Sequence, residues 1–424
     1  MSLQGFSLTE LRGGGHLSKQ PVLEALRRAI PDEAIDAVIE EAGAQEQRKR
    51  RLPARLVVAF AIALGLWARE GLVDVLKNLV DGLGEHDPAP WRAWQPPVKS
   101  ALSQARRRLG PRPLWLLFRR LAGPVAPPGL PGAFLCGRRL MAIDGTTLDL
   151  PDTPENDRAF GRPSTTLKDG TVRSGPFPQV KLVWLIEVGT HVVCDLLVRP
   201  CATSEVPLAR RLVRSVEAGM LVLWDRGLHS YAMLRAATER GADFLGRVSA
   251  TVALDPEEPL ADGSFLTTLY PSAAARARRE GGILVRAIEY TIDDPARPRP
   301  HERYRLVTSL LDPVAAPAAT LAIEYHQRWE IESALDEFKV HQVDRRPAPH
   351  LCSRHPREVV QELYGLVLAH RAIRCLMAEA AARADLDPDR LSFTGTLRLL
   401  RRAIPRAQRA LASPDASPLS STAS

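Results

Sequence analysis

The pattern of apolar residues changes along this chain, and that change constrains the fold more than any other feature. Residues 20–120 repeat apolar side chains at helical spacing, as at Leu56 and Phe60. A stretch rich in proline and glycine follows at residues 123–137 and indicates a domain boundary. From residue 138 onward, short apolar runs alternate with helical segments. The sequence therefore predicts an α/β protein that begins with an all-helical region.

The second part of the chain predicts a sheet, in the order strand, hairpin, helix, strand, helix, strand. The strands are expected at residues 140–143, 180–186, 191–198, 221–224 and 243–248, and the helices at 205–218 and 231–240. Turn residues and a strand-like run interrupt this order at about residues 250–303, so we expect a β-rich insertion there. A strand at 304–309 and long helices at 315–340 and 359–378 follow.

The charge balance favours a polyanionic partner. The net charge is +8, which is typical of many nucleic-acid-binding proteins. One arginine run, Arg106-Arg107-Arg108, ends a short helix predicted at residues 99–109. That helix is either a helix-turn-helix reader of DNA or part of a bundle with a solvated basic face, and the segment alone does not choose between them.

The cysteines and apolar runs point to a cytoplasmic protein without a membrane span. The five cysteines form no CxxC pair, so we expect buried reduced thiols rather than disulfides or structural zinc. The longest apolar run, residues 56–68, is too short to cross a bilayer and predicts a buried helix. The N-terminus lacks the pattern of a secretory signal.

Two aspartates directly follow predicted strands. Asp144 closes the first strand of the sheet, and Asp225 closes the strand at residues 221–224. Strand ends are where α/β sheets present functional side chains. Either aspartate could instead cap a local turn.

A third acid comes from the helix predicted at residues 315–340. Tyr325, Arg328, Glu332 and Lys339 fall within roughly 60° of one another at about 100° per residue, so they share one face. Such a set is unusual for a core but suits a phosphate backbone, with the acid binding metal and the cations holding phosphate oxygens. Glu332 could instead form a surface ion pair with Arg328.

Asp336 is an alternative third acid, four residues beyond Glu332 on the same face, whereas Glu330 and Glu337 point elsewhere. Clustered carboxylates repel one another unless a cation neutralises them. Oxygen-rich sites of this kind suit Mg²⁺ or Mn²⁺. Two such ions about 4 Å apart could activate an attacking water or 3′-hydroxyl and stabilise the leaving oxygen.

A family resemblance distinguishes between these acids. The spacing Tyr325-x2-Arg328-x3-Glu332-x6-Lys339 resembles the YREK signature of DDE transposases in the insertion sequence four family. The segments Asp144-Gly145-Thr146 and Asp225-Arg226-Gly227-x3-Tyr231 resemble the two aspartate regions of that family. The likeness extends from the helical N-terminal region to about residue 380, and it favours Glu332 over Asp336.

The resemblance implies an RNase H-like catalytic core interrupted by the β-rich insertion, and a helical N-terminal domain that binds transposon ends. The expected domain ranges are 1–122 for the helical domain, 123–137 for the linker, 138–405 for the catalytic domain and 406–424 for a disordered tail. By similarity, Asp144, Asp225 and Glu332 bind two metal ions. Tyr325, Arg328 and Lys339 then contact terminal phosphates.

The function that the resemblance implies is metal-dependent cleavage at the ends of an insertion sequence and strand transfer into target DNA, by a homodimer bound to the terminal inverted repeats. Two alternatives are a catalytically silent DNA-binding protein or repressor, and an RNase H-like metal nuclease without strand transfer. The acid triad argues against the first, and the phosphate-contacting set against the second.

Relatives with this signature often cut DNA through a hairpin intermediate, in which an aromatic side chain holds a flipped base. The insertion has no tryptophan, only Phe265, Tyr270 and Tyr290, so no base-holding residue is assigned.

Overall fold

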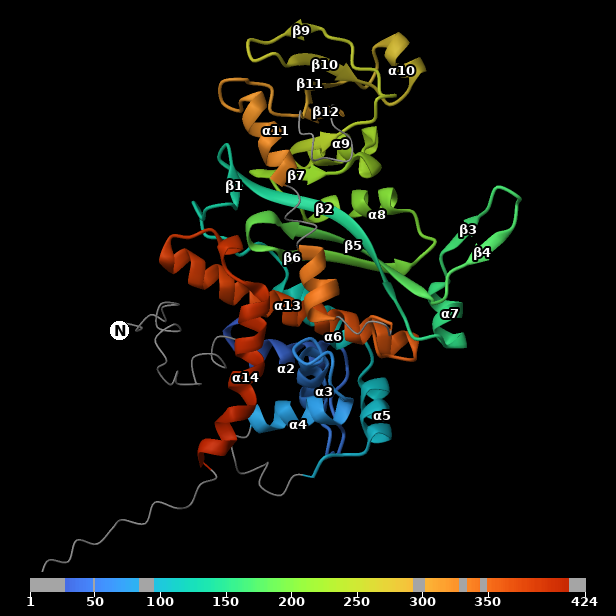
Figure 1. Ribbon diagram of the computed structural model, residues 1–424, viewed down its shortest axis with the longest axis vertical. Coiled ribbons are helices and arrows are strands. Elements are labelled where there is room, and N and C mark those ends of the chain that lie inside the picture. Colours follow the sequence, from blue (N-terminus) through green and yellow to red (C-terminus); the bar gives the residue numbers. More distant parts are fainter. Residues whose placement is uncertain are drawn as a thin grey trace, which may run out of the picture.

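The computed structural model describes residues 27–48, 50–83, 95–292, 302–327, 334–343 and 349–411, and leaves undescribed the side chains of 81–83 and 403–411. Two predicted site residues, Arg328 and Glu332, lie outside these ranges, and so do residues 412–424 of the predicted tail. Figure 1 shows the N-terminal helices at one end of the molecule, a twisted sheet across the middle, and the strands of the insertion at the other end.

The N-terminal part is helical, as expected. Its helices are α2 (Asp32–Glu41), α3 (Ala54–Ala63), α4 (Leu72–Leu83), α5 (Lys99–Leu109) and α6 (Arg112–Leu121). Pro31, Pro53 and Pro111 immediately precede α2, α3 and α6. Proline is tolerated there because the first N–H groups of a helix have no helical acceptor.

Five strands form the central part of the sheet. They are β2 (Arg138–Asp149), β5 (Gln179–Glu187), β6 (Val192–Pro200), β7 (Met220–Trp224) and β8 (Asp243–Arg247). Their order across the sheet is β6-β5-β2-β7-β8. β5 runs antiparallel to β2 and β6, whereas β7 runs parallel to β2 and β8. This order and polarity agree with the predicted RNase H-like fold.

The insertion is β-rich, as predicted, and it continues the same sheet. Beyond β8 lie β12 (Arg303–Thr308), β11 (Ile283–Thr291), β10 (Phe265–Leu269) and β9 (Glu258–Pro259), each antiparallel to its neighbour. α10 (Ala273–Arg278) lies between β10 and β11 in the chain. Ile288 and Leu306 pack into the core shared with the N-terminal helices, so the insertion is joined to the rest by packing as well as by strand pairing.

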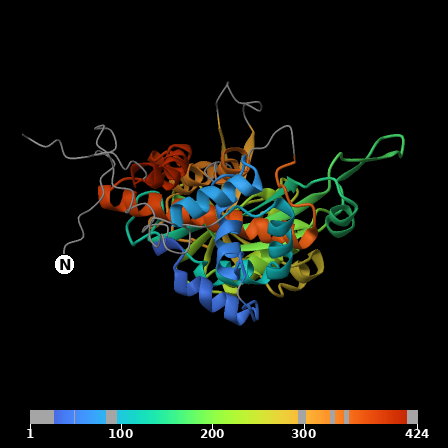
Figure 2. The same cartoon turned by 90° about the horizontal axis from the view of Figure 1, so that it is seen from below.

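A small ribbon stands apart from this sheet. After β2 the chain forms α7 (Pro154–Phe160), and then β3 (Ser164–Thr166) and β4 (Val172–Ser174) pair with each other alone. The ribbon projects from the body of the molecule in two perpendicular views (Figures 1 and 2). All residues from 164 to 174 are exposed.

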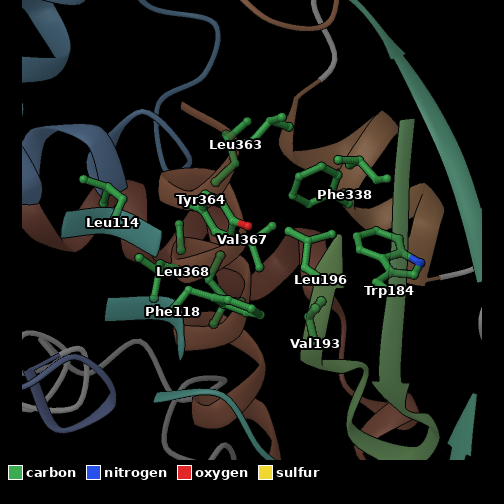
Figure 3. Packing of buried hydrophobic residues seen from close by; sticks show 14 of the residues in the cluster. Leu114, Phe118, Trp184, Val193, Leu196, Phe338, Leu363, Tyr364, Val367 and Leu368 are labelled. Atoms are coloured by element: carbon green, nitrogen blue, oxygen red, sulfur yellow. The ribbon is translucent and has the colours of Figure 1, made fainter. Parts of the chain in front are cut away.

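Helices cover both faces of the main sheet. α8 (Glu205–Leu212) and α9 (Tyr231–Glu239) pack on one face. α11 (Ala318–Gln327), α13 (Pro356–Ala384) and α14 (Phe393–Leu411) contribute to the core on the other. Figure 3 shows Tyr364 and Leu368 of α13 between Phe118 of α6 and Leu196 of β6. One continuous core therefore joins the N-terminal helices, α13 and the sheet.

The arginine run at the end of α5 departs from expectation, since Arg106 is only 2% exposed. Its guanidinium donates to Gln361 and Ser353, both at 2.8 Å, and thereby ties α5 to α13 and the segment before it. Arg108 donates to the carbonyl of Leu52 at 2.8 Å. Both interpretations of the run assume exposed arginines, and this is wrong for Arg106, because buried acceptors across the core satisfy its N–H donors.

The strand expected at residues 140–143 extends further than predicted. As β2 it continues to Asp149, so Asp144 lies within the strand and does not close it, because the pairing with β5 runs on after the pairing with β7 has ended.

Several helix bounds also differ from the prediction. The helix expected at residues 205–218 ends at Leu212 and continues as a short 3₁₀ turn. The helix expected at 315–340 is α-helical over α11, and its last described part, Glu337–Gln342, is a π-helix. There the N–H of Val343 donates to the carbonyl of Phe338, five residues back, at 3.1 Å. α14 extends through residues 406–411 of the predicted tail.

The burial of the cysteines and the length of the helices can also be compared with the predictions. All five cysteines are free, as expected, but only Cys194 is buried, and the other four are half-buried. The prediction of buried thiols is therefore wrong for those four. None of the helices within the described ranges combines the length and the hydropathy that a bilayer span requires.

Gly365 provides a test of the contact between α13 and α3. A Cβ atom there would lie 2.2 Å from the carbonyl oxygen of Ala61. We expect Gly365→Ala to lower the free energy of unfolding by about 1–3 kcal/mol, because the backbones must move apart within a packed core. Urea denaturation followed by circular dichroism measures this.

The matched control is Gly395→Ala in α14, where the nearest atoms belong to the Ser392 side chain at 3.2 Å. Alanine is favoured over glycine in a helix by about 1 kcal/mol, so this variant should be neutral or more stable. Equal destabilisation by both substitutions would contradict the close helix contact at Gly365.

Candidate active site

The pairing of β2 with β7 brings Asp144 and Asp225 together. The strands run parallel, and their last paired residues are Ile143 and Trp224, each immediately before an aspartate. Neighbouring strands lie about 4.8 Å apart, so the two aspartates occupy adjacent positions where the pairing ends. Both side chains are half-buried.

Strand alternation places both carboxylates on the same face of the sheet. Ala142 and Leu223 belong to the core that contains α13 and the N-terminal helices. Their sequence neighbours point to the core beneath α8 and α9. Successive side chains along a strand point to opposite faces, so Asp144 and Asp225 share the face of Ala142 and Leu223. This face also receives α11.

Each aspartate also accepts a hydrogen bond from the backbone N–H that follows it. Gly145 donates to Oδ1 of Asp144 at 2.7 Å, and Arg226 donates to Oδ1 of Asp225 at 2.5 Å. These are the local turn bonds that the simpler interpretation of the two residues predicts. A carboxylate offers about four lone-pair sites on two oxygens, so a turn bond and a cation can share it.

α11 brings Tyr325 to Asp225. The Tyr325 side chain is 4% exposed, and its hydroxyl donates to Oδ1 of Asp225 at 3.5 Å. The insertion fixes the start of the helix: Oδ2 of Asp262 accepts the Ala318 N–H at 2.8 Å. Arg286 of β11 pairs with the same carboxylate. The insertion thereby sets the position of Tyr325 over the sheet.

Lys339 approaches the other aspartate. Burial lowers the pKa of its ammonium group, and the negative charges of Asp336, Asp144 and Asp149 oppose that shift. Lys339 is half-buried and within electrostatic range of Asp144. Tyr325 therefore contacts Asp225, and the charge of Lys339 interacts with Asp144.

Arg328 and Glu332 lie between Tyr325 and Lys339 in the chain but outside the described residues. Their roles remain predictions. No group of three metal-ligating side chains occurs within the described ranges, which do not include the predicted third ligand. Asp336, the alternative third acid, is described and is exposed.

A buried charge network beneath this helix was not predicted from the sequence. Glu337 is 9% exposed. Nε of Arg374 donates to its Oε2 at 2.8 Å, and ring nitrogens of His191 and His370 lie 3.4 Å from the same oxygen. Burial alone would raise the pKa of the Glu337 carboxyl, but the close approach of the two histidines and the charge of Arg374 hold it well below its usual range. Glu337 therefore points away from the Tyr325 face, as expected, into a site of its own.

One sequence signal could have indicated this network. His370 and Arg374 are spaced by four residues, which places them on one face of a helix that is otherwise largely apolar. Polar residues on a buried helix face require partners. The partner Glu337 and the hairpin residue His191 come from distant parts of the chain, so only the fold shows which groups meet.

Comparison with known proteins shows two family matches. Residues 20–119 match the insertion element 4 transposase N-terminal domain, and residues 135–371 match the transposase DDE domain. The chain is 30% identical over 388 residues to the transposase InsG for insertion sequence element IS4 of Escherichia coli (strain K12), covering 90% of this chain and 83% of the relative.

Two further proteins are similar. The putative transposase InsZ of Escherichia coli (strain K12) is 26% identical over 227 residues, which cover 54% of this chain and 71% of the relative. A solved structure, the piggyBac transposase synaptic complex with hairpin DNA, aligns with a TM-score of 0.45 and 13% identity over 93% of this chain and 82% of that chain.

The Glu337 network predicts a pH-dependent stability. Glu337→Gln should lower the free energy of unfolding by about 3–5 kcal/mol at pH 7, because Arg374 would stay buried without its carboxylate. The folded-state pKa of Glu337 is lowered, so its contribution is present above the unfolded pKa, about 4.5, and is lost as the pH falls below it. Urea denaturation at pH 7 and pH 3.5 should therefore show a smaller difference between wild type and variant at the lower pH.

The matched control is Glu379→Gln, whose carboxylate is exposed and pairs with Arg28 and Arg383. It should change the free energy of unfolding by less than about 1 kcal/mol. A Glu337→Gln deficit that is the same at both pH values would argue against an ion pair.

Proposed function

This chain belongs to the insertion element 4 family of DDE transposases, and on that premise we propose that Asp144, Asp225 and Glu332 are the carboxylates that hold its catalytic metal. The protein is a DNA transposase, an enzyme that cleaves DNA strands and transfers them. The observation that carries the proposal is the parallel pairing of β2 with β7, which places Asp144 and Asp225 side by side on the face that receives α11.

Divalent metal dependence follows from the DDE domain. Two carboxylates side by side on adjacent strands repel each other unless a cation lies between them. Hard divalent cations prefer such oxygen ligands, so we propose two Mg²⁺ or Mn²⁺ ions. When bound, the ions would lower the pKa of the attacking water or 3′-hydroxyl and stabilise the leaving oxygen.

Tyr325, Arg328 and Lys339 are proposed to hold the terminal phosphates of the DNA. Two of them lie within the described residues: the Tyr325 hydroxyl contacts Asp225, and the charge of Lys339 interacts with Asp144. Partial burial removes water from around the Lys339 ammonium, and this strengthens its attraction to a phosphate. In this arrangement the cations orient the strand while the carboxylates act at the scissile bond.

We propose that residues 1–122 recognise the terminal inverted repeats, which the match to the N-terminal transposase domain supports. Arg106 and Arg108 hold the fold together, so other surfaces of this region would contact the DNA.

Strand transfer into target DNA joins two ends at once, and a homodimer would supply one active site for each. The relatives are bacterial, and a cytoplasmic location would give the enzyme access to DNA.

Removal of one carboxylate should abolish the chemistry. Asp225→Asn and Glu332→Gln should each lose Mg²⁺-dependent nicking of a duplex carrying the ends of the element, by about a hundredfold or more, because the metal site loses a charged ligand and the metal supplies several kcal/mol of transition-state stabilisation. Binding of the same duplex in EDTA should change little. Asp336→Asn is the control and should nick normally. Loss of nicking in Asp336→Asn with retention in Glu332→Gln would identify Asp336 as the third ligand.

Removal of the Lys339 charge should weaken binding rather than metal loading. For Lys339→Ala we expect the slope of log K against log salt to fall by about 0.9, as for the loss of one phosphate contact. Fluorescence anisotropy with end DNA from 50 to 200 mM NaCl measures the slope. A slope identical to that of the wild type would exclude Lys339 from the phosphate contacts.

A further inference from the structure

The ribbon, defined here as residues 164–174 of β3, β4 and their connecting turn, has both faces open to solvent. It buries no side chain, and none of its residues belongs to a hydrophobic core of the described protein. A two-stranded hairpin without packing is marginally stable in water. A feature of this kind is not explained by the stability of the fold.

The ribbon is nevertheless well formed. At its tip the N–H of Leu167 donates to the carbonyl of Thr171 at 2.8 Å, and Asp169 accepts the Thr171 N–H at 2.9 Å. At its base Arg162 donates to Asp157 at 3.2 Å and to the carbonyl of Pro176 at 2.7 Å, next to where the ribbon leaves the body. These bonds hold an extended arm in a defined direction before any ligand is present.

The side chains of the ribbon suit a nucleic acid. They are mainly hydroxyl and cationic groups, namely Ser164, Thr165, Thr166, Lys168, Thr171, Arg173 and Ser174. Serine, threonine, lysine and arginine are the side chains that contact phosphate and sugar in DNA complexes. Among the described residues neither Lys168 nor Arg173 has an ion-pair partner. The single acid, Asp169, is engaged in the turn at the tip.

A protein partner fits this surface less well. Protein interfaces are enriched in aromatic residues and methionine and are depleted of lysine and serine. The ribbon has no aromatic residue and no methionine, and its exposed apolar side chains are Leu167, at 44%, and Val172, at 62%. A two-stranded antiparallel ribbon also has the dimensions that the major groove of B-DNA admits.

The strand that carries Asp144 leads directly to the ribbon. From Asp144 to Asp149 at the end of β2 the chain advances about 17 Å, at about 3.3 Å per residue. α7 and the ribbon lie beyond that end of the strand (Figure 1). One turn of B-DNA is about 34 Å long, so a duplex that runs from the aspartates along β2 would reach the ribbon within its first turns.

We propose that the ribbon enters the major groove of the duplex held at Asp144 and Asp225, with Lys168 and Arg173 on its phosphates. This inference rests on the proposed function, since it assumes that DNA is held at those residues. In this contact the cations of the ribbon meet the phosphates, and the ribbon fits the groove by its shape, without reading the bases. The ribbon would therefore hold DNA of many sequences, as contact with flanking or target DNA requires.

The test is a charge reversal on the ribbon with a matched control. Lys168→Glu/Arg173→Glu changes the ribbon, and Arg210→Glu/Arg211→Glu makes the same charge change on exposed arginines of α8, which covers the face of the sheet opposite the aspartates. Anisotropy with a mixed-sequence duplex of about 40 base pairs in EDTA, from 50 to 200 mM NaCl, gives affinity and salt slope. Mg²⁺-dependent nicking of end DNA is measured in parallel.

For the ribbon variant we expect a loss of affinity of tenfold or more relative to the α8 control, and a slope smaller by about two. Lys168→Gln/Arg173→Gln should show the same slope change with a smaller loss of affinity.

If both ribbon variants match the control while the wild type nicks end DNA, the ribbon inference is overturned and the proposed function stands. If the wild type binds but does not nick, the proposed function fails, and a ribbon effect on binding would still support the DNA contact. A ribbon variant that alters the sedimentation of the free protein but not its DNA affinity would indicate a protein contact and overturn the proposal.

Discussion

The parallel contact between β2 and β7 is the constraint on which the rest of the molecule depends. It sets Asp144 beside Asp225 at the point where the pairing ends, at a separation where two negative charges disfavour each other. The core must therefore be rigid enough to hold the pair in place. Leu140, Ala142 and Leu223 lie on the same face of these strands, fully buried, and pack into the core that includes α13. The site stands at the edge of the most completely packed part of the protein.

The segment that carries the proposed third ligand is fixed on both sides by buried charge. At the start of α11, Asp262 and Arg286 hold the first turn of the helix. Beyond it, Glu337 is held by Arg374 on α13. Tyr325 lies on the helix that the first anchor holds, and Lys339 follows Glu337 by two residues in the chain. Because the first anchor comes from the insertion, that part of the chain positions the active site as well as extending the sheet.

The sequence predicts where the strands lie, because strands follow from local patterns, but it does not predict that the strand of Asp144 continues to Asp149. Apolar runs that end in aspartate mark Asp144 and Asp225, and the signature spacing marks the helix that follows the insertion. It does not predict that Arg106 is buried or that Glu337 meets His191, since these depend on contacts between residues far apart in the chain. A run of arginines reads as a solvated or DNA-binding face until the acceptors on and near α13 are known. The π-helix at Glu337–Gln342 could not be predicted either, because a constant rotation of about 100° per residue describes only an α-helix.

The use of ion pairs at these anchors has a physical reason. Burying a charge costs desolvation, and apolar residues of similar volume often stabilise a fold as well or better. Apolar contacts, however, tolerate rotation and sliding, whereas an Arg–carboxylate pair fixes distance and direction at once. An active site must hold its carboxylates within a fraction of an ångström of a productive arrangement, so the segments around it need contacts that fix both distance and direction. We infer that Arg286 and Arg374 mainly fix the geometry of the site, because they hold the helical segments that carry Tyr325 and Lys339, the residues proposed to contact the DNA.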